Sequence, residues 1–82
     1  MRTIEVSHQR YNGGIPFEIE SSAKTFGEFK SELSSLKQLD ITMENRAVLT
    51  SHGEVELSNS NQELPEGNIS IMVTPKTMKA GK

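Results

Sequence analysis

The residues of this 82-residue chain that could do chemistry are two histidines and a set of glutamates. His8 ends an alternating segment on the side that carries Ile4 and Val6, and His52 lies in a predicted turn beside Gly53. Neither histidine has a nucleophile or further metal ligands at a suitable spacing, so we expect structural or solvated roles for both. Because the chain has no cysteine, thiolate catalysis, disulfides and cysteine metal sites are excluded.

The glutamates do not form an acid–base pair in the predicted fold. Glu18, Glu20, Glu54 and Glu56 fall on strand faces that we expect to meet water, whereas catalytic carboxylates need a cleft that gives them different environments. Asn12-Gly13-Gly14 predicts a turn and not a phosphate-binding loop, because no helix start follows it. We therefore predict that the chain is not an enzyme and that it has no cofactor and no metal site.

The first part of the chain predicts a β-hairpin. Residues 3–8 alternate between apolar and polar side chains, which indicates a half-buried strand. Asn12-Gly13 is typical of a tight hairpin turn, and residues 15–20 then form a second strand with alternate apolar side chains, beginning with Ile15, on one face. Pro16 cannot donate a ladder hydrogen bond, so this strand should lie at a sheet edge or contain a bulge.

A capped helix follows the hairpin. Thr25 and Glu28 have the spacing of a capping box, in which the threonine hydroxyl accepts an amide hydrogen bond and the glutamate reaches back. The expected apolar stripe consists of Phe26, Phe29, Leu33 and Leu36, and the expected outer face of Lys30, Glu32, Ser34 and Lys37. The helix should end near Gln38 and pack its stripe on the hairpin.

The second half of the chain predicts three shorter strands joined by polar turns. In chain order these are a strand at 46–50, a turn at 51–54, a strand at 55–57, a polar connection at 58–62, a turn at 64–67 and a strand at 69–73 that ends before Pro75. The elements together predict an α+β domain with one helix packed across a mixed sheet of four or five strands. We expect this domain to cover residues 1–75 and a flexible basic tail to cover residues 76–82.

The order of these elements resembles the ubiquitin-like β-grasp fold over essentially the whole chain. The segments RAVLTSHGEVEL and ELPEGNISIMVTP lie where the third, fourth and fifth strands of that family lie. The resemblance implies that the last strand lies parallel to the first in the middle of the sheet. The turn LPEGN is also similar to that of the small sulfur carriers of thiamin and molybdopterin synthesis. The ending is similar to that of small phage and mobile-element proteins.

The last residues of the chain are relevant to an alternative function that the resemblance implies, that of a sulfur carrier or a C-terminally activated modifier. Such proteins are activated at a C-terminal diglycine, since two residues without Cβ let an extended tail enter a narrow channel. Here the chain ends Ala80-Gly81-Lys82, with alanine in place of the first glycine and a lysine after the second. Removal of Lys82 would expose Gly81 but would leave an imperfect end.

Charge and apolar content limit the remaining partners. Residues 1–66 carry six basic and eleven acidic side chains, and residues 67–82 carry three lysines and no acid. An acidic body with few lysines and no stacking aromatics near them argues against sequence-specific nucleic-acid binding. The chain shows no signal peptide and no apolar run that would span a membrane. We therefore expect a cytoplasmic protein, in the host cytoplasm if phage-encoded, that is a monomer or a weak homo-oligomer.

We predict a non-catalytic protein-binding module, with a phage accessory or host-directed role implied by the resemblance. Its exposed sheet face should present Thr3, Glu5, Glu18, Ser70, Met72 and Thr74 to an unknown protein partner. Lys76 and Lys79 form a second candidate contact, a basic arm whose binding would weaken with salt. Free strand edges, at Pro16 and at the short third strand, offer a further docking mode by β-augmentation.

Overall fold

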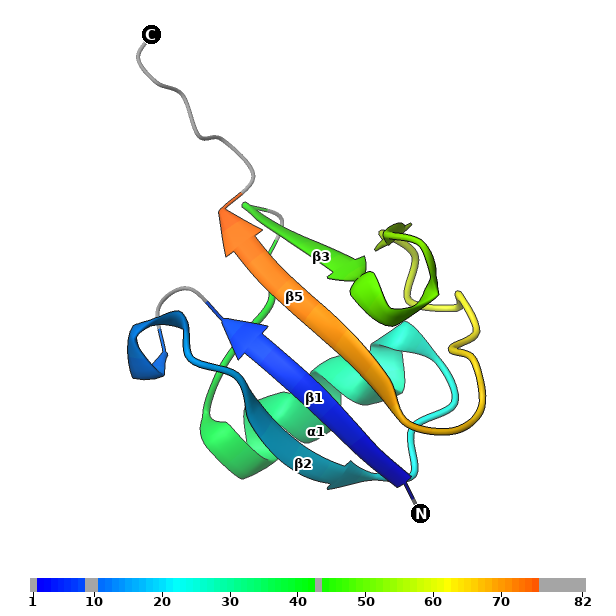
Figure 1. The fold of residues 1–82 in the computed structure, drawn as a ribbon, viewed down its shortest axis with the longest axis horizontal. Coiled ribbons are helices and arrows are strands. Elements are labelled where there is room, and N and C mark those ends of the chain that lie inside the picture. The colour runs from blue at the N-terminus through cyan, green and yellow to red at the C-terminus, as the bar shows by residue number, and fades with distance from the viewer. Residues whose placement is uncertain (1, 9–10, 43, 76–82) are drawn as a thin grey trace, which may run out of the picture.

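The computed structural model describes residues 2–8, 11–42 and 44–75. Within these residues the chain forms one α-helix and five β-strands in a single mixed sheet, so the predicted α+β class is confirmed (Figure 1). The strands are β1 (Arg2–His8), β2 (Phe17–Ser21), β3 (Asn45–Leu49), β4 (Val55–Leu57) and β5 (Ile69–Pro75). The helix is α1 (Phe26–Lys37), and two short 3₁₀ turns are η1 (Asn12–Gly14) and η2 (Thr50–His52).

The sheet has the strand order β2-β1-β5-β3-β4. β1 pairs antiparallel with β2, which confirms the predicted hairpin, and pairs parallel with β5, which confirms the expected central pairing. In this register Ile4 lies opposite Ile19 on one side and Ile69 on the other. β3 runs antiparallel to both β5 and β4. Figure 1 shows β1 and β5 side by side, with α1 behind the sheet.

The core lies between α1 and one face of the sheet. Phe26, Phe29 and Leu33 are buried, as the helical spacing predicts. They pack against the inward side chains of the sheet, which are Ile4, Val6, Ile19, Ala47, Leu49, Leu57, Ile69, Ile71 and Val73. The prediction for Leu36 is wrong, since its side chain is 54% exposed. At about 100° per residue it falls at the margin of the stripe, and it lies in the last turn of the helix.

The N-terminus of α1 is closed by its own cap and by the connection between β4 and β5. Thr25 Oγ1 accepts a hydrogen bond from Glu28 N at 3.3 Å, as predicted, but the Glu28 carboxylate accepts from Lys24 N at 2.7 Å instead of from the cap amide. Phe26 N donates to Gln62 O and Gly27 N donates to Ser60 O, each at 2.9 Å. The first helical amides therefore already have protein partners and cannot receive an anion.

The connection within the hairpin is longer than the tight turn predicted at Asn12-Gly13. β1 ends at His8 and β2 begins only at Phe17, and the intervening turn η1 has Gly13 and Gly14 at positive φ. Ile15 consequently precedes the strand and is 61% exposed, so its expected place on the inward face is wrong. Pro16 precedes β2 as well, and β2 lies at the sheet edge that its missing N–H suggested.

Replacing Phe29 by alanine tests the core. Phe29 is fully buried between α1 and the sheet, so Phe29→Ala should lower the free energy of unfolding by about 3–5 kcal/mol because it leaves a cavity. Leu36→Ala on the exposed side of the same helix is the control and should cost less than about 1 kcal/mol. Urea denaturation measures both values. Equal losses for the two variants would contradict this arrangement of the helix.

Candidate functional site

The face of the sheet opposite α1 is not covered by any described element, and we call it the open face. The strand registers and the alternating burial along β1 and β5 define its members. They are Glu18 and Glu20 of β2, Thr3, Glu5 and Ser7 of β1, Ser70, Met72 and Thr74 of β5, Arg46 and Val48 of β3, and Glu56 of β4. All six residues that the sequence assigned to an exposed sheet face lie on this one surface.

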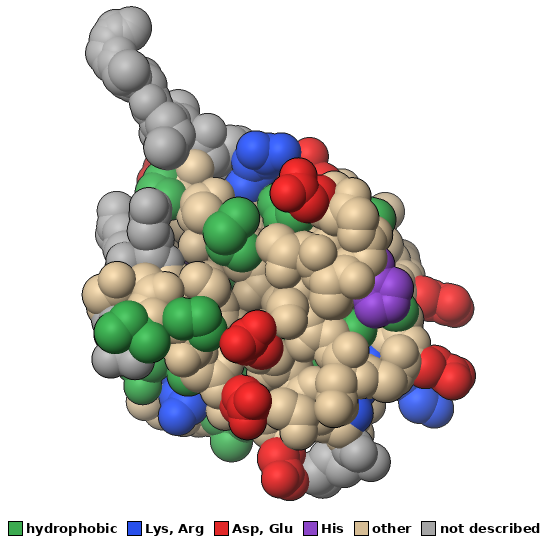
Figure 2. Space-filling view, in the orientation of Figure 1, with side chains coloured by type: hydrophobic (Ala, Val, Ile, Leu, Met, Phe, Trp, Pro, Cys, Tyr) green, Lys and Arg blue, Asp and Glu red, His purple; other side chains and the backbone are tan. Residues whose placement is uncertain are grey.

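Three glutamates occupy the side of the open face formed by β1 and β2. Glu5 lies directly opposite Glu18, and Glu20 follows on the same side of β2. Ser70, on the other side of Glu5, donates a hydrogen bond from its Oγ to Glu5 Oε1 at 3.0 Å. Figure 2 shows a line of acidic side chains over β1 and β2, and further acidic side chains lie with the basic ones toward the margins of the view. Two like charges directly opposite each other destabilise a strand pair.

The centre of the open face is apolar. Met72 is 38% exposed and lies between Ser7 of β1 and Val48 of β3. The sequence interpretation placed Met72 among polar neighbours and missed Val48. The alternation in β3 contains the signal, because Ala47 and Leu49 face the core and the residue between them must face the other way. Val48 is only 8% exposed, so the small apolar patch beside the three glutamates consists mainly of Met72, with Val48 packed next to it.

Arg46 and Glu56 form an ion pair at 3.4 Å across β3 and β4, and about half of each side chain is exposed. It is the only ion pair found between described residues. Thr74 lies opposite Arg46 and completes this end of the open face. Since Arg46 already has a carboxylate partner, the glutamates of β1 and β2 have no counter-ion within the described part of the chain.

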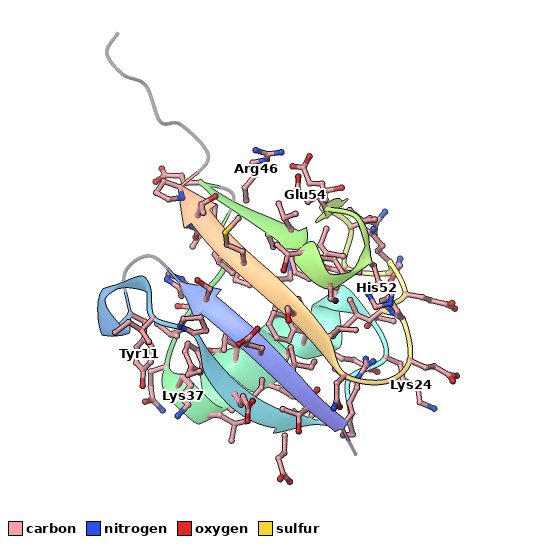
Figure 3. The ribbon with its side chains drawn as sticks, viewed as in Figure 1. Tyr11, Lys24, Lys37, Arg46, His52 and Glu54 are labelled. Atoms are coloured by element: carbon pink, nitrogen blue, oxygen red, sulfur yellow. The ribbon has the colours of Figure 1, made fainter. Side chains whose placement is uncertain are left out.

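The two histidines lie apart from one another, on β1 and in η2. His8 is 5% exposed and faces the core side of β1, as predicted. His52 is exposed in η2, with its Nδ1 3.0 Å from Ser51 Oγ, and Figure 3 shows it at the rim of the molecule, far from Tyr11. Across the described ranges, no three histidine, aspartate or glutamate side chains gather in a way that could hold a metal ion.

A hollow lies between residues 21–25 and residues 63–67, and Arg2, one of the residues that line it, forms a structural clamp there. The Arg2 guanidinium donates to Ala23 O at 2.7 Å, to Gly67 O at 3.0 Å and also to Pro65 O. These carbonyls belong to the two connections that flank the start of β1. The hydrogen bonds of Arg2 therefore hold the two connections together, and the hollow lies where these connections meet.

The remaining expectations fall on strand edges and on the tail. The sheet edges are β2 and β4, so the expectation of a free edge at the third strand is wrong, because β5 and β4 enclose β3. Lys76, Lys79 and the ending that concerns the sulfur-carrier alternative, residues 80–82, lie outside the described residues. Within the described chain no helix has the length and apolar character needed to cross a membrane.

The opposed glutamates make a testable prediction about stability. Glu18→Gln removes one of the two facing charges, so it should raise the free energy of unfolding by about 0.2–1 kcal/mol at low salt. The gain should shrink at about 0.5 M salt, because exposed charges are then screened. Glu44→Gln, at an exposed site before β3, is the control and should change little. A loss of stability in Glu18→Gln would contradict the predicted repulsion.

No protein-family model matches this chain, and no curated protein matches it either. The function is therefore inferred from the fold and from the chemistry of the open face.

Proposed function

We propose that this chain is a ubiquitin-like β-grasp domain that acts without catalysis, by binding another protein through its open face. Three observations support the fold assignment: the order of two strands, helix and three strands, the parallel pairing of β1 with β5 at the sheet centre, and the single helix across one face. The resemblance to small phage and mobile-element proteins makes an accessory or host-directed role part of this proposal.

The assignment of the open face as the binding surface rests on the exposure of Met72. Met72 is 38% exposed, lies next to the buried Val48 and has polar side chains around it, which is the composition of a small contact patch with a polar rim. Methionine also adapts its shape to different partners. The open face has no described helix or loop across it, so a partner would reach this patch without rearrangement of the domain.

The size of the open face sets the strength of the contact. Neighbouring strands lie about 4.8 Å apart and residues about 3.3 Å apart along a strand, so five strands offer roughly 20 Å by 20 Å. That area is about half of the ~800 Å² that each partner contributes to a standard stable interface. We therefore expect a weak or transient complex unless the partner also contacts an edge of the sheet.

Replacing Met72 by glutamate tests the proposed surface. Met72→Glu places a charge in the apolar patch and should reduce partner capture from native-cell lysate by roughly tenfold, as the loss of a central contact does. Leu36→Glu is the matched control, because Leu36 is also exposed and apolar but lies on α1, behind the sheet. Quantitative mass spectrometry of captured proteins measures the effect. If both variants retain the same proteins at the same level, the open face is not the binding surface.

A further inference from the structure

We propose that the open face binds an extended, positively charged protein segment in which an aliphatic side chain lies two residues from a lysine or arginine. This inference rests on the proposed function and specifies the chemistry of the partner. The charge balance of the open face and the spacing between its apolar patch and its glutamates both favour such a segment.

Charge complementarity selects a cation. Glu5 and Glu18 face each other across β1 and β2, Glu20 lies beside them, and none has a basic partner among the described residues. A guanidinium or ammonium group placed over Glu5 and Glu18 would bond to carboxylates and at the same time remove their mutual repulsion. Among the described residues of the open face, the only basic side chain is that of Arg46, which is paired with Glu56 at 3.4 Å and does not supply that cation.

The spacing between Met72 and Glu5 fits an extended partner segment with a particular sequence pattern. Met72 lies opposite Ser7, and Ser7 is two residues along β1 from Glu5. Strand geometry places Met72 and Glu5 about 8 Å apart between Cα atoms, close to the ~7 Å between alternate residues of an extended chain. A segment whose aliphatic side chain covers Met72 therefore brings its next side chain on the same side close to the glutamates. If that side chain is lysine or arginine, it can pair with them.

The same charges exclude other occupants of the open face. A nucleic-acid backbone would be repelled by the glutamates of β1 and β2. A second copy that docked its β1 and β2 over the same strands of this chain would place those glutamates against their own counterparts. Residues 76–82 of this chain carry Lys76, Met78 and Lys79, so they have a composition that fits the open face. The test must therefore separate an external segment from this one.

A titration with two synthetic peptides tests the proposed chemistry. The first peptide carries one leucine followed by arginine two and four residues later, and its analogue has glutamate in place of both arginines. The arginine peptide should shift the ¹⁵N–¹H signals of open-face residues and should bind more weakly as salt rises from about 0.05 to about 0.5 M. The proposal is overturned if the glutamate analogue binds this face equally well.

Matched charge variants identify the residues responsible. Glu5→Gln with Glu18→Gln should weaken binding of the arginine peptide about three- to tenfold, the range expected for two exposed ion pairs. Glu44→Gln with Glu63→Gln removes two exposed acids elsewhere and should leave the affinity unchanged. Equal affinities for both double variants would overturn the assignment of these glutamates.

Two further measurements separate the remaining outcomes. In the 82-residue chain, replacement of Lys76, Lys79 and Lys82 by serine should leave the affinity for the arginine peptide within about twofold. Tightening beyond about tenfold would instead assign the open face to residues 76–82 of the chain itself. A photo-crosslinker at position 72 tests the partner from cells. A captured segment rich in lysine or arginine supports the inference, and an acidic or neutral segment overturns it while the proposed function stands. Capture of nothing overturns the proposed function itself.

Discussion

The structure depends on one constraint, which is that a single helix can cover only one face of the sheet. Phe26, Phe29 and Leu33 of α1 are buried against that face, and the alternation of side chains along every strand sends the other half of the residues to the opposite side. With no second layer in the described chain, those residues meet solvent. The open face and its exposed Met72 are thus consequences of how this small chain builds its core.

Local sequence patterns predict much of this fold, because each pattern depends on residues that are close together in the chain. The strict alternation in β1 and β5 and the Thr25 cap could be read directly, since a strand's two faces and a helix's first turn involve neighbouring residues. The exposure of Ile15 and Leu36 could not be predicted in this way, because it depends on where the sheet ends. The Arg2 clamp could not be predicted either, since it joins atoms as many as 65 residues apart in the chain.

The candidate site was predictable in composition but not in arrangement. Glu5, Glu18 and Met72 were assigned to one face from their positions in alternating segments, and they lie on one face. The register that puts Glu5 directly opposite Glu18 depends on hairpin length, and the Asn12-Gly13 signal suggests a shorter turn than the one formed. That register places two surface acids directly opposite each other as a repelling pair, and this pair is the basis for the positive charge that we propose for the partner.

The most direct test of this account is a charge exchange across the interface. In Glu5→Lys with Glu18→Lys, the side of the open face formed by β1 and β2 changes sign while Met72 and Val48 stay in place. We expect this variant to bind the glutamate peptide and to reject the arginine peptide, which reverses the preference of the natural chain. ¹⁵N–¹H NMR titration of both proteins with both peptides measures the four affinities. An unchanged preference for the arginine peptide would contradict the account.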